Sequence, residues 1–146
     1  MGDCNHVHVP MEPRLKLSKE SSNPPVDATF YRSIVGSLRY LVHTRPDISF
    51  VVPYVSRFME KPTTEHMAAV KHLLRYIAGT RNYGCRYVKD EDGGKLIGYS
   101  DSDMAGDIDD RKSTSGALFM LGGSPVTWQS QKIGRASCRE RVYVLV

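Results

Sequence analysis

The stretch of residues 95–132 constrains the fold more than any other part of this sequence. Three short strand-like runs lie within it, at residues 96–99, 116–121 and 125–129. A Gly-Gly-Ser turn separates the last two runs, as is typical of antiparallel strands joined by a tight connection. The first run leads into Asp101, and four more carboxylates follow, at Asp103, Asp107, Asp109 and Asp110. We therefore expect an antiparallel meander with a carboxylate at the end of its first strand.

Helical patterns occupy the region before this meander. The first begins after Asp27, a plausible N-cap, with apolar residues at helical spacing at Tyr31, Ile34, Leu38 and Leu41. Asp47 can cap a second helix, which is expected to kink at Pro53, because proline inside a straight helix costs about 3 kcal/mol. The pattern also predicts a further strand over residues 83–88.

The third helical pattern is the clearest. Thr63 or Thr64 can cap it, Gly79 can end it, and Met67, Val70, Leu74 and Ile77 would form its apolar face. Helices followed by strands indicate two units and an α+β fold rather than one layered α/β domain. We expect an irregular arm at residues 1–27, a helical segment at 28–90, a sheet segment at 91–132 and a separate tail at 133–146.

Composition excludes several classes of protein. The 146 residues carry a net charge of +4, and 40% of them are hydrophobic. No apolar run approaches the roughly 18 residues that span a bilayer, and the N-terminal residues lack the pattern of a signal peptide. Three widely spaced cysteines form neither a disulfide framework nor a zinc pattern, so an intracellular location is expected. The mild basicity permits nucleic-acid binding without establishing it.

Several long segments of the sequence resemble one protein family. YSDSDMAGD, DRKSTSG and WQSQK resemble the ribonuclease H domain of copia-type LTR retrotransposon Pol polyproteins. Two stretches, YRSIVGSLRYLVHTRPDISF and YVSRFMEKPTTEHMAAVKHLLRYIAGT, resemble the segment that follows the reverse transcriptase palm in the same polyproteins. The stretch PMEPRLKLSK resembles the arm just after the palm. The resemblance implies a thumb-like or connection-like helical bundle followed by an incomplete ribonuclease H-like antiparallel sheet.

The resemblance also implies a chemistry. Ribonuclease H cleaves the RNA of an RNA–DNA hybrid with two Mg²⁺ ions held by about four converging carboxylates. By match to the family pattern Asp101 is the first of these acids, with Asp103 a weaker candidate ligand. The alternative is that Asp101 is an ordinary aspartate at the end of a strand, with no role in metal binding. Asp107, Asp109 and Asp110 look more like solvated turn residues, because aspartate side chains bond the local backbone in turns.

Two groups of residues could contact nucleic acid. Arg111, Lys112 and Ser113 offer cations and a hydroxyl suited to the phosphates of a hybrid, although a solvated turn explains them equally well. Lys71 and Arg75 stand four apart on the third helix and could touch the template–primer, although charged helix faces are usually just solvated. The partners implied are an RNA–DNA hybrid or template–primer and the rest of the Pol polyprotein, in a cytoplasmic particle or the nucleus, with no membrane.

The resemblance to the family does not continue into residues 133–142. IGRASCRERV matches the translation of a sequencing-library adapter, so we expect a non-native tail, with a genuine basic terminus as the alternative. The chain is thus expected to be a Pol fragment that lacks the polymerase acids and most ribonuclease H acids, and to be inactive by itself. The alternatives are a non-catalytic nucleic-acid-binding module and a non-functional relic.

Overall fold

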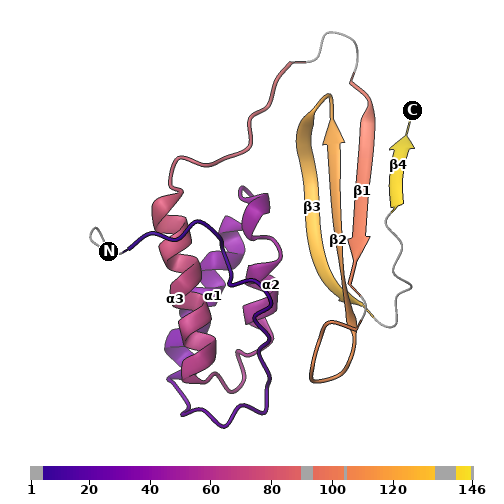
Figure 1. Cartoon of the computed structure of the whole chain (residues 1–146). Coiled ribbons are helices and arrows are strands. Elements are labelled where there is room, and N and C mark those ends of the chain that lie inside the picture. The colour runs from indigo at the N-terminus through magenta and orange to yellow at the C-terminus, as the bar shows by residue number, and fades with distance from the viewer. Residues whose placement is uncertain (1–4, 90–93, 104, 134–140, 146) are drawn as a thin grey trace. The chain divides into compact units, whose positions relative to one another are not determined.

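The protein comprises a helical unit followed by a sheet unit (Figure 1). The computed structural model describes residues 5–89, 94–103, 105–133 and 141–145, the last range by its backbone alone. The two compact units are Met1–Tyr83 and Gly84–Val146, whereas the sequence predicts that the helical segment ends at residue 90. Among the residues that the structure describes, all helices fall in the first unit and all strands in the second, which confirms the expected α+β fold.

Helix α1, Ala28–Leu41, forms as the sequence predicts. The Asp27 carboxylate accepts a hydrogen bond of 2.8 Å from the Thr29 N–H and so satisfies one of the free donors at the helix start. Tyr31, Val35 and Leu38 are buried, and the opposite side faces solvent. One face of α1 therefore belongs to the core.

The second helical pattern is divided into two short helices. A 3₁₀ turn, η1, covers Pro46–Ile48, and helix α2 covers only Val51–Ser56. Pro53 lies in the first turn of α2, where a backbone N–H would have no intrahelical partner, so it does not kink a longer helix as predicted. The prediction that Asp47 caps this helix is also wrong, because Asp47 lies inside η1 and its carboxylate binds Arg45 and Tyr76.

Helix α3, Thr64–Gly79, begins with a reciprocal cap. Thr63 is the N-cap, and its N–H donates to Nδ1 of His66 at 3.0 Å. In return, the Thr63 side chain accepts a hydrogen bond from the backbone N–H of His66. The other ring nitrogen of His66, Nε2, lies 3.0 Å from the carbonyl oxygen of Ser18. A carbonyl oxygen can only accept, so the buried ring is the tautomer protonated at Nε2. The cap thereby also holds the N-terminal arm.

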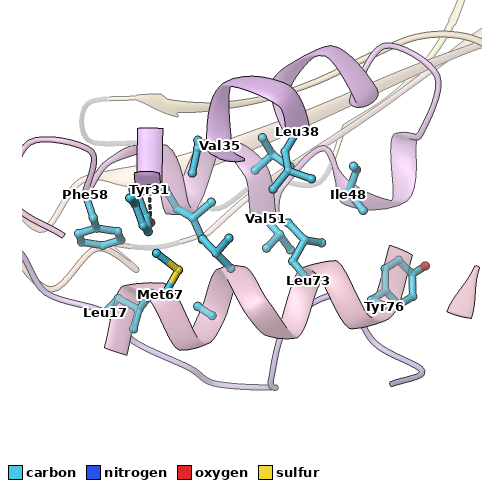
Figure 2. Close-up of a cluster of buried hydrophobic side chains, with 14 residues drawn as sticks. Leu17, Tyr31, Val35, Leu38, Ile48, Val51, Phe58, Met67, Leu73 and Tyr76 are labelled. Atoms are coloured by element: carbon cyan, nitrogen blue, oxygen red, sulfur yellow. Dashed lines mark hydrogen bonds between the residues drawn. The ribbon is translucent and has the colours of Figure 1, made fainter. Parts of the chain in front are cut away.

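The core of the first unit lies where the three helices meet (Figure 2). Its fully buried side chains include Tyr31, Ile48 and Leu73. The irregular arm contributes Leu17, which is 3% exposed, and the Leu17 N–H donates to the Tyr54 hydroxyl at 2.9 Å. The arm thus packs on the surface of the helical unit as one part of its fold.

The second unit is an antiparallel sheet in the order β3-β2-β1-β4. Its strands are β1 (Leu96–Ser102), β2 (Ser113–Leu121), β3 (Ser124–Ile133) and β4 (Arg141–Leu145). Gly122 and Gly123, with φ of +54° and +77°, form the two-residue hairpin turn between β2 and β3, as the glycine pair predicts. In the described part of this unit, no hydrophobic side chain is fully buried. The arrangement is consistent with an incomplete ribonuclease H-like fold.

Two expectations for the ends of the sheet need comment. The strand predicted over residues 83–88 is absent: these residues are irregular, and the Val88 N–H donates to the side-chain hydroxyl of Ser124 and not to a backbone carbonyl of a neighbouring strand. The expected tail from Ile133 onward falls largely on residues 134–140, outside the described residues. Beyond them, β4 pairs with β1, with Tyr99 opposite Val142.

Candidate functional site

Asp101 lies near the end of β1, as the sequence predicts. It pairs with Gly116 of β2, and its backbone carbonyl accepts a hydrogen bond of 3.2 Å from the Ser115 hydroxyl. The residue is exposed. A glycine opposite Asp101 adds no side chain beside it, so its carboxylate is open to solvent and ligands.

Asp103, the second candidate ligand, has a structural partner. One carboxylate oxygen accepts the Thr114 N–H at 2.5 Å, and the Asp103 N–H donates to the Thr114 carbonyl at 3.0 Å. Gly106 passes so close to the Asp103 carboxylate that a side chain there would collide with it. These contacts hold the chain after β1 against the start of β2 and leave Asp103 less available than Asp101.

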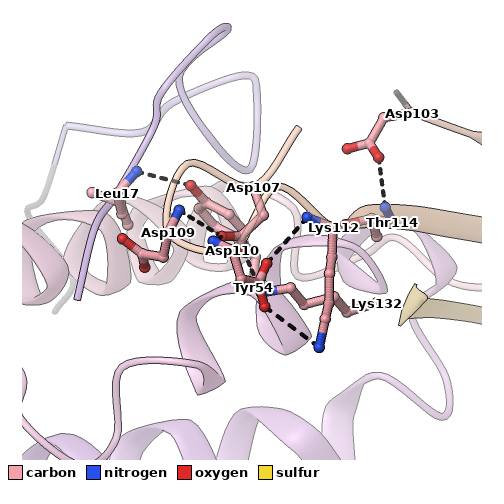
Figure 3. A network of polar contacts seen from close by, with 9 residues as sticks. All are labelled: Leu17, Tyr54, Asp103, Asp107, Asp109, Asp110, Lys112, Thr114 and Lys132. Atoms are coloured by element: carbon pink, nitrogen blue, oxygen red, sulfur yellow. Dashed lines mark hydrogen bonds and ion pairs between the residues drawn. The ribbon is translucent and has the colours of Figure 1, made fainter. Parts of the chain in front are cut away.

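The acids at positions 107 and 110 meet Lys132, the penultimate residue of β3 (Figure 3). The ammonium of Lys132 lies 2.6 Å from Asp107 Oδ2 and 2.9 Å from Asp110 Oδ1. The other oxygen of Asp107 accepts the N–H groups of Asp109 and Asp110 at 2.9 and 3.3 Å. This is the turn geometry expected for these aspartates, and the ion pair fastens the turn to the edge strand.

The ion pairs among Asp107, Asp110 and Lys132 shift the pKa of each group towards its charged form. Burial by itself raises the pKa of Asp107, but the hydrogen bonds from Lys132 and from two backbone N–H groups outweigh it and bring the pKa to about 2. The hydrogen bond from Lys132 likewise lowers the pKa of Asp110. Burial lowers the pKa of Lys132, yet its two carboxylate partners raise it overall. The cluster therefore stays ionised at neutral pH.

These acids do not make a two-metal site by themselves. Two divalent ions need several carboxylates that converge from separate elements. Among the described residues, no group of three or more histidine, cysteine, aspartate or glutamate side chains could hold a metal ion. Asp101 offers one open carboxylate, while Asp103 and Asp107 already have hydrogen-bond partners. The described residues thus do not fit a bound pair of Mg²⁺ ions.

The predicted phosphate-binding residues lie at the same end of the sheet as Asp101. Arg111 and Lys112 are exposed, and Arg111, directly after the turn at residues 108–110, has a φ of +56°. Lys112 lies 3.7 Å from an oxygen of Asp110, a loose contact between exposed groups. Ser113 differs from the two cations: it is 2% exposed, and its hydroxyl accepts the Ala105 N–H. Only the two cations are presented to a ligand.

The helical candidates lie on α3, in the other unit. Lys71 and Arg75 are exposed, but His72 between them is buried and its Nε2 lies 2.9 Å from the Val9 carbonyl. Arg75 also lines a shallow pocket of about 230 Å³ together with Glu12 and Glu65. Those carboxylates oppose the positive charge of Arg75 locally, so this face suits phosphate less well than the turn at Arg111.

Sequence reasoning missed a buried network at the end of α3. Arg45 is only 5% exposed. Its guanidinium donates to both carboxylate oxygens of Asp47 and to the carbonyl of Thr80, the last at 3.0 Å. Tyr76 donates to the same Asp47 carboxylate at 2.8 Å. The only signal in the sequence is an Arg-Pro-Asp tripeptide, and its partners are about 30 residues away.

The similarity of the chain to known proteins identifies its family. It is 50% identical over 126 residues to the retrovirus-related Pol polyprotein from transposon RE1 of Arabidopsis thaliana and 45% identical over 126 residues to that from transposon RE2. It is 44% identical over 153 aligned residues to the Pol polyprotein from transposon TNT 1-94 of Nicotiana tabacum. These alignments cover 86%, 86% and 99% of the chain.

The chain belongs to the retrovirus-related Pol polyproteins of copia-type transposons. It spans 8%, 9% and 11% of the length of these three Pol polyproteins. No protein-family model matches the chain, and no solved structure matches it. Among the described residues, the helices of this Pol chain are all too short or too polar to cross a bilayer.

Proposed function

We propose that this chain is the part of a Pol polyprotein that links the end of reverse transcriptase to the start of ribonuclease H. The whole polyprotein would copy RNA into DNA and hydrolyse the RNA of the resulting hybrid. The chain alone would hold the hybrid and catalyse neither reaction. The observation that carries this proposal is the exposed carboxylate of Asp101, which lies at the same end of an antiparallel sheet as the exposed cations Arg111 and Lys112.

The division of labour follows from charge and geometry. Arg111 and Lys112 can neutralise phosphates of the hybrid without reading its sequence. Asp101 would supply one oxygen ligand for Mg²⁺, and further acids from elsewhere in the polyprotein would have to complete the set. Without them, one open carboxylate holds no pair of ions, so a bound hybrid would remain uncleaved.

A binding and cleavage assay tests this proposal. The purified chain is mixed with a fluorescent RNA–DNA hybrid at low and moderate salt, with and without Mg²⁺. We expect binding that weakens steeply with salt and no cleavage. Replacing both cations of the turn, Arg111→Gln with Lys112→Gln, removes up to two phosphate contacts and should lower the logarithmic salt slope by roughly 1 to 2.

The matched control removes the same charge elsewhere. Arg39 and Lys61 are exposed cations of the helical unit, and the pair Arg39→Gln with Lys61→Gln should leave the slope closer to that of the original chain. Equal effects of the two pairs would show that only net charge matters. Cleavage in Mg²⁺ that Asp101→Asn abolishes would overturn the inactivity of the chain. Absence of hybrid binding at low salt would leave a non-functional relic as the remaining interpretation.

A further inference from the structure

His66, at the start of α3, is a buried titratable side chain that the proposed function does not use. It is 0% exposed, and its ring stacks on that of Phe58 with 4.0 Å between the ring centres. Its Nδ1 accepts the N–H of Thr63 at 3.0 Å, and its Nε2 donates to the carbonyl of Ser18 at 3.0 Å. The neutral ring therefore uses both of its nitrogens, with the proton at Nε2.

A second proton on the His66 ring does not fit this arrangement. It would have to bind to Nδ1, which would then direct an N–H at the N–H of Thr63. The new N–H could turn to the Thr63 hydroxyl, 3.1 Å away, but the backbone N–H of Thr63 would lose its acceptor inside the protein. A buried charge and a buried donor without an acceptor both cost free energy, so the closed structure requires a neutral ring.

The same ring connects the N-terminal arm to α3. Leu17, the residue before Ser18, is 3% exposed and belongs to the core that contains Met67 (Figure 2). Further along the arm, the carbonyl of Pro24 accepts the N–H of Thr64 at 2.9 Å. Because the histidine ring is fully buried, water reaches it only when this part of the arm separates from the helix.

We propose that His66 makes the docking of the N-terminal arm sensitive to acid, with residues 17–26 closed on α3 while the ring is neutral and open when it binds a second proton. An imidazole in water binds that proton near pH 6.5. The open arm therefore binds more protons than the closed arm, so the closed arm is most stable above pH 6.5 and loses stability as the pH falls. This inference concerns the helical unit and does not rest on the proposed function.

Other charged side chains lie on the elements that pack around the ring. Glu65 on α3 accepts hydrogen bonds of 3.1 Å from two side chains of the arm, and Arg57, next to Phe58, lies 5.1 Å from the centre of a tyrosine ring. Lys19 on the arm and Lys61 before the cap are exposed. Lysine, arginine and most carboxylates keep their charge between about pH 5 and pH 7, so histidines change charge most in this range.

His72, six residues further along α3, is a buried histidine that can accept a second proton. Its Nε2 lies 2.9 Å from the carbonyl oxygen of Val9, and its Nδ1 lies 3.6 Å from a carboxylate oxygen of Glu12. The carbonyl takes the Nε2 proton, so a second proton on Nδ1 would face a carboxylate and not an N–H. We therefore expect acid to open the arm through His66 and not through His72.

Hydrogen exchange followed by NMR on the whole chain at pH 7, 6 and 5 tests this proposal. The amides of Leu17 and Thr63 are the reporters, and each rate is divided by that of the same amide in an unfolded peptide at the same pH. If the closed ring stays neutral, opening binds one proton. The opening constant should then rise by up to about 25-fold between pH 7 and pH 5.

His66→Gln keeps the cap and removes the titration. Thr-x-x-Gln is an ordinary capping box, in which the glutamine side chain accepts the N–H of the N-cap residue. The variant loses the bond to Ser18, so its arm should be more open at pH 7, but its opening constant should rise by only about threefold or less down to pH 5. His72→Gln is the matched control, since it removes another buried histidine of α3 that contacts an arm carbonyl, and it should keep the rise of the original chain.

Three results would overturn the proposal: an equal rise in His66→Gln and the original chain, loss of the rise in His72→Gln, or unchanged exchange of Leu17 and Thr63 between pH 7 and pH 5. An NMR titration of the His66 ring in the original chain needs no variant. A ring that binds its second proton near pH 6.5 while the Leu17 amide stays protected would also overturn it.

Discussion

Asp107 shows how one carboxylate can serve a fold instead of a reaction. It is 8% exposed, accepts two backbone N–H groups and pairs with Lys132 across the mouth of the turn. Asp101, six residues earlier, is exposed and has an open carboxylate. The two acids have the same side chain, and their surroundings assign them different tasks.

The lowered pKa of Asp107 predicts an acid-sensitive turn. A carboxylate whose pKa is lower in the folded state stabilises that state above its unfolded pKa, near 4, and loses this contribution as the pH falls towards the folded value of about 2. We expect Asp107→Asn to reduce the stability of the sheet unit by about 1 to 2 kcal/mol at pH 7, and by much less at pH 2.

Urea unfolding followed by β-sheet circular dichroism at pH 7, 4 and 2 measures this difference. Asp101→Asn is the matched control, since the same substitution at an exposed position should change stability by less than about 0.5 kcal/mol at every pH. A loss for Asp107→Asn that does not shrink between pH 4 and pH 2 would show that the ion pair with Lys132 is not its cause.

At the scale of elements, the second helical region shows how a proline can be accommodated. Pro53 lies two residues after the start of α2 and follows the break between η1 and α2. The first backbone bond of this turn runs from the Tyr54 N–H to the Phe50 carbonyl at 3.2 Å, one residue beyond the proline. The helix begins where the proline does no harm.

This placement predicts a small effect of replacing Pro53. A proline inside a continuous helix would cost about 3 kcal/mol, so its removal would stabilise the protein by about that amount. In the first turn no hydrogen bond is missing, and we expect Pro53→Ala to change the free energy of unfolding by less than about 1 kcal/mol. Thermal unfolding followed by helical circular dichroism measures the change.

The control for Pro53→Ala places a proline where it must break a helix. Val70→Pro lies in the middle of α3 and should destabilise the helical unit by about 3 kcal/mol or more. If Pro53→Ala instead raised the stability by about 3 kcal/mol, residues 47–58 would have to form one kinked helix in solution.

At the scale of the whole molecule, the two units differ in how they exclude water. The helical unit contains every fully buried hydrophobic side chain in the described part of the chain, including Val35, Val52 and Leu73. The sheet unit relies on strand pairing, on the ion pairs of Lys132 and on half-buried side chains such as Leu118 and Trp128. Burial of apolar surface is the larger source of stability, so the units should differ in how readily they open.

Hydrogen exchange measured by mass spectrometry on the whole chain tests this difference. We expect the amides in the middle of α3, from Val70 to Tyr76, to exchange slowest. Those of β3, an edge strand in the described sheet, should exchange fastest among the paired strands β1 to β3. Leu73→Ala should accelerate exchange in α1 and α3 without changing β2. Equal protection of α3 and β3 would contradict the difference between the units.

Local signals in the sequence predicted most elements. Asp27 before an apolar 3.6-residue pattern predicted α1, Thr63 predicted the start of α3, and Gly122-Gly123 predicted the hairpin between β2 and β3. Each of these depends on residues only a few positions apart, so the sequence contains all the information needed. The sequence segments shared with Pol polyproteins identified the family, because they too can be recognised without knowing the fold.

What the tertiary structure decided depends on residues far apart in the chain. Lys132 meets Asp107 only because three strands bring their ends together, and Arg45 meets Thr80 only because α3 returns to η1. Residues 83–88 have the composition of a strand but pair with no strand in the described part of the chain, so Tyr83 and Tyr87 are exposed to solvent. A strand, an ion pair and a buried network each need a second partner, and only the folded chain determines where that partner lies.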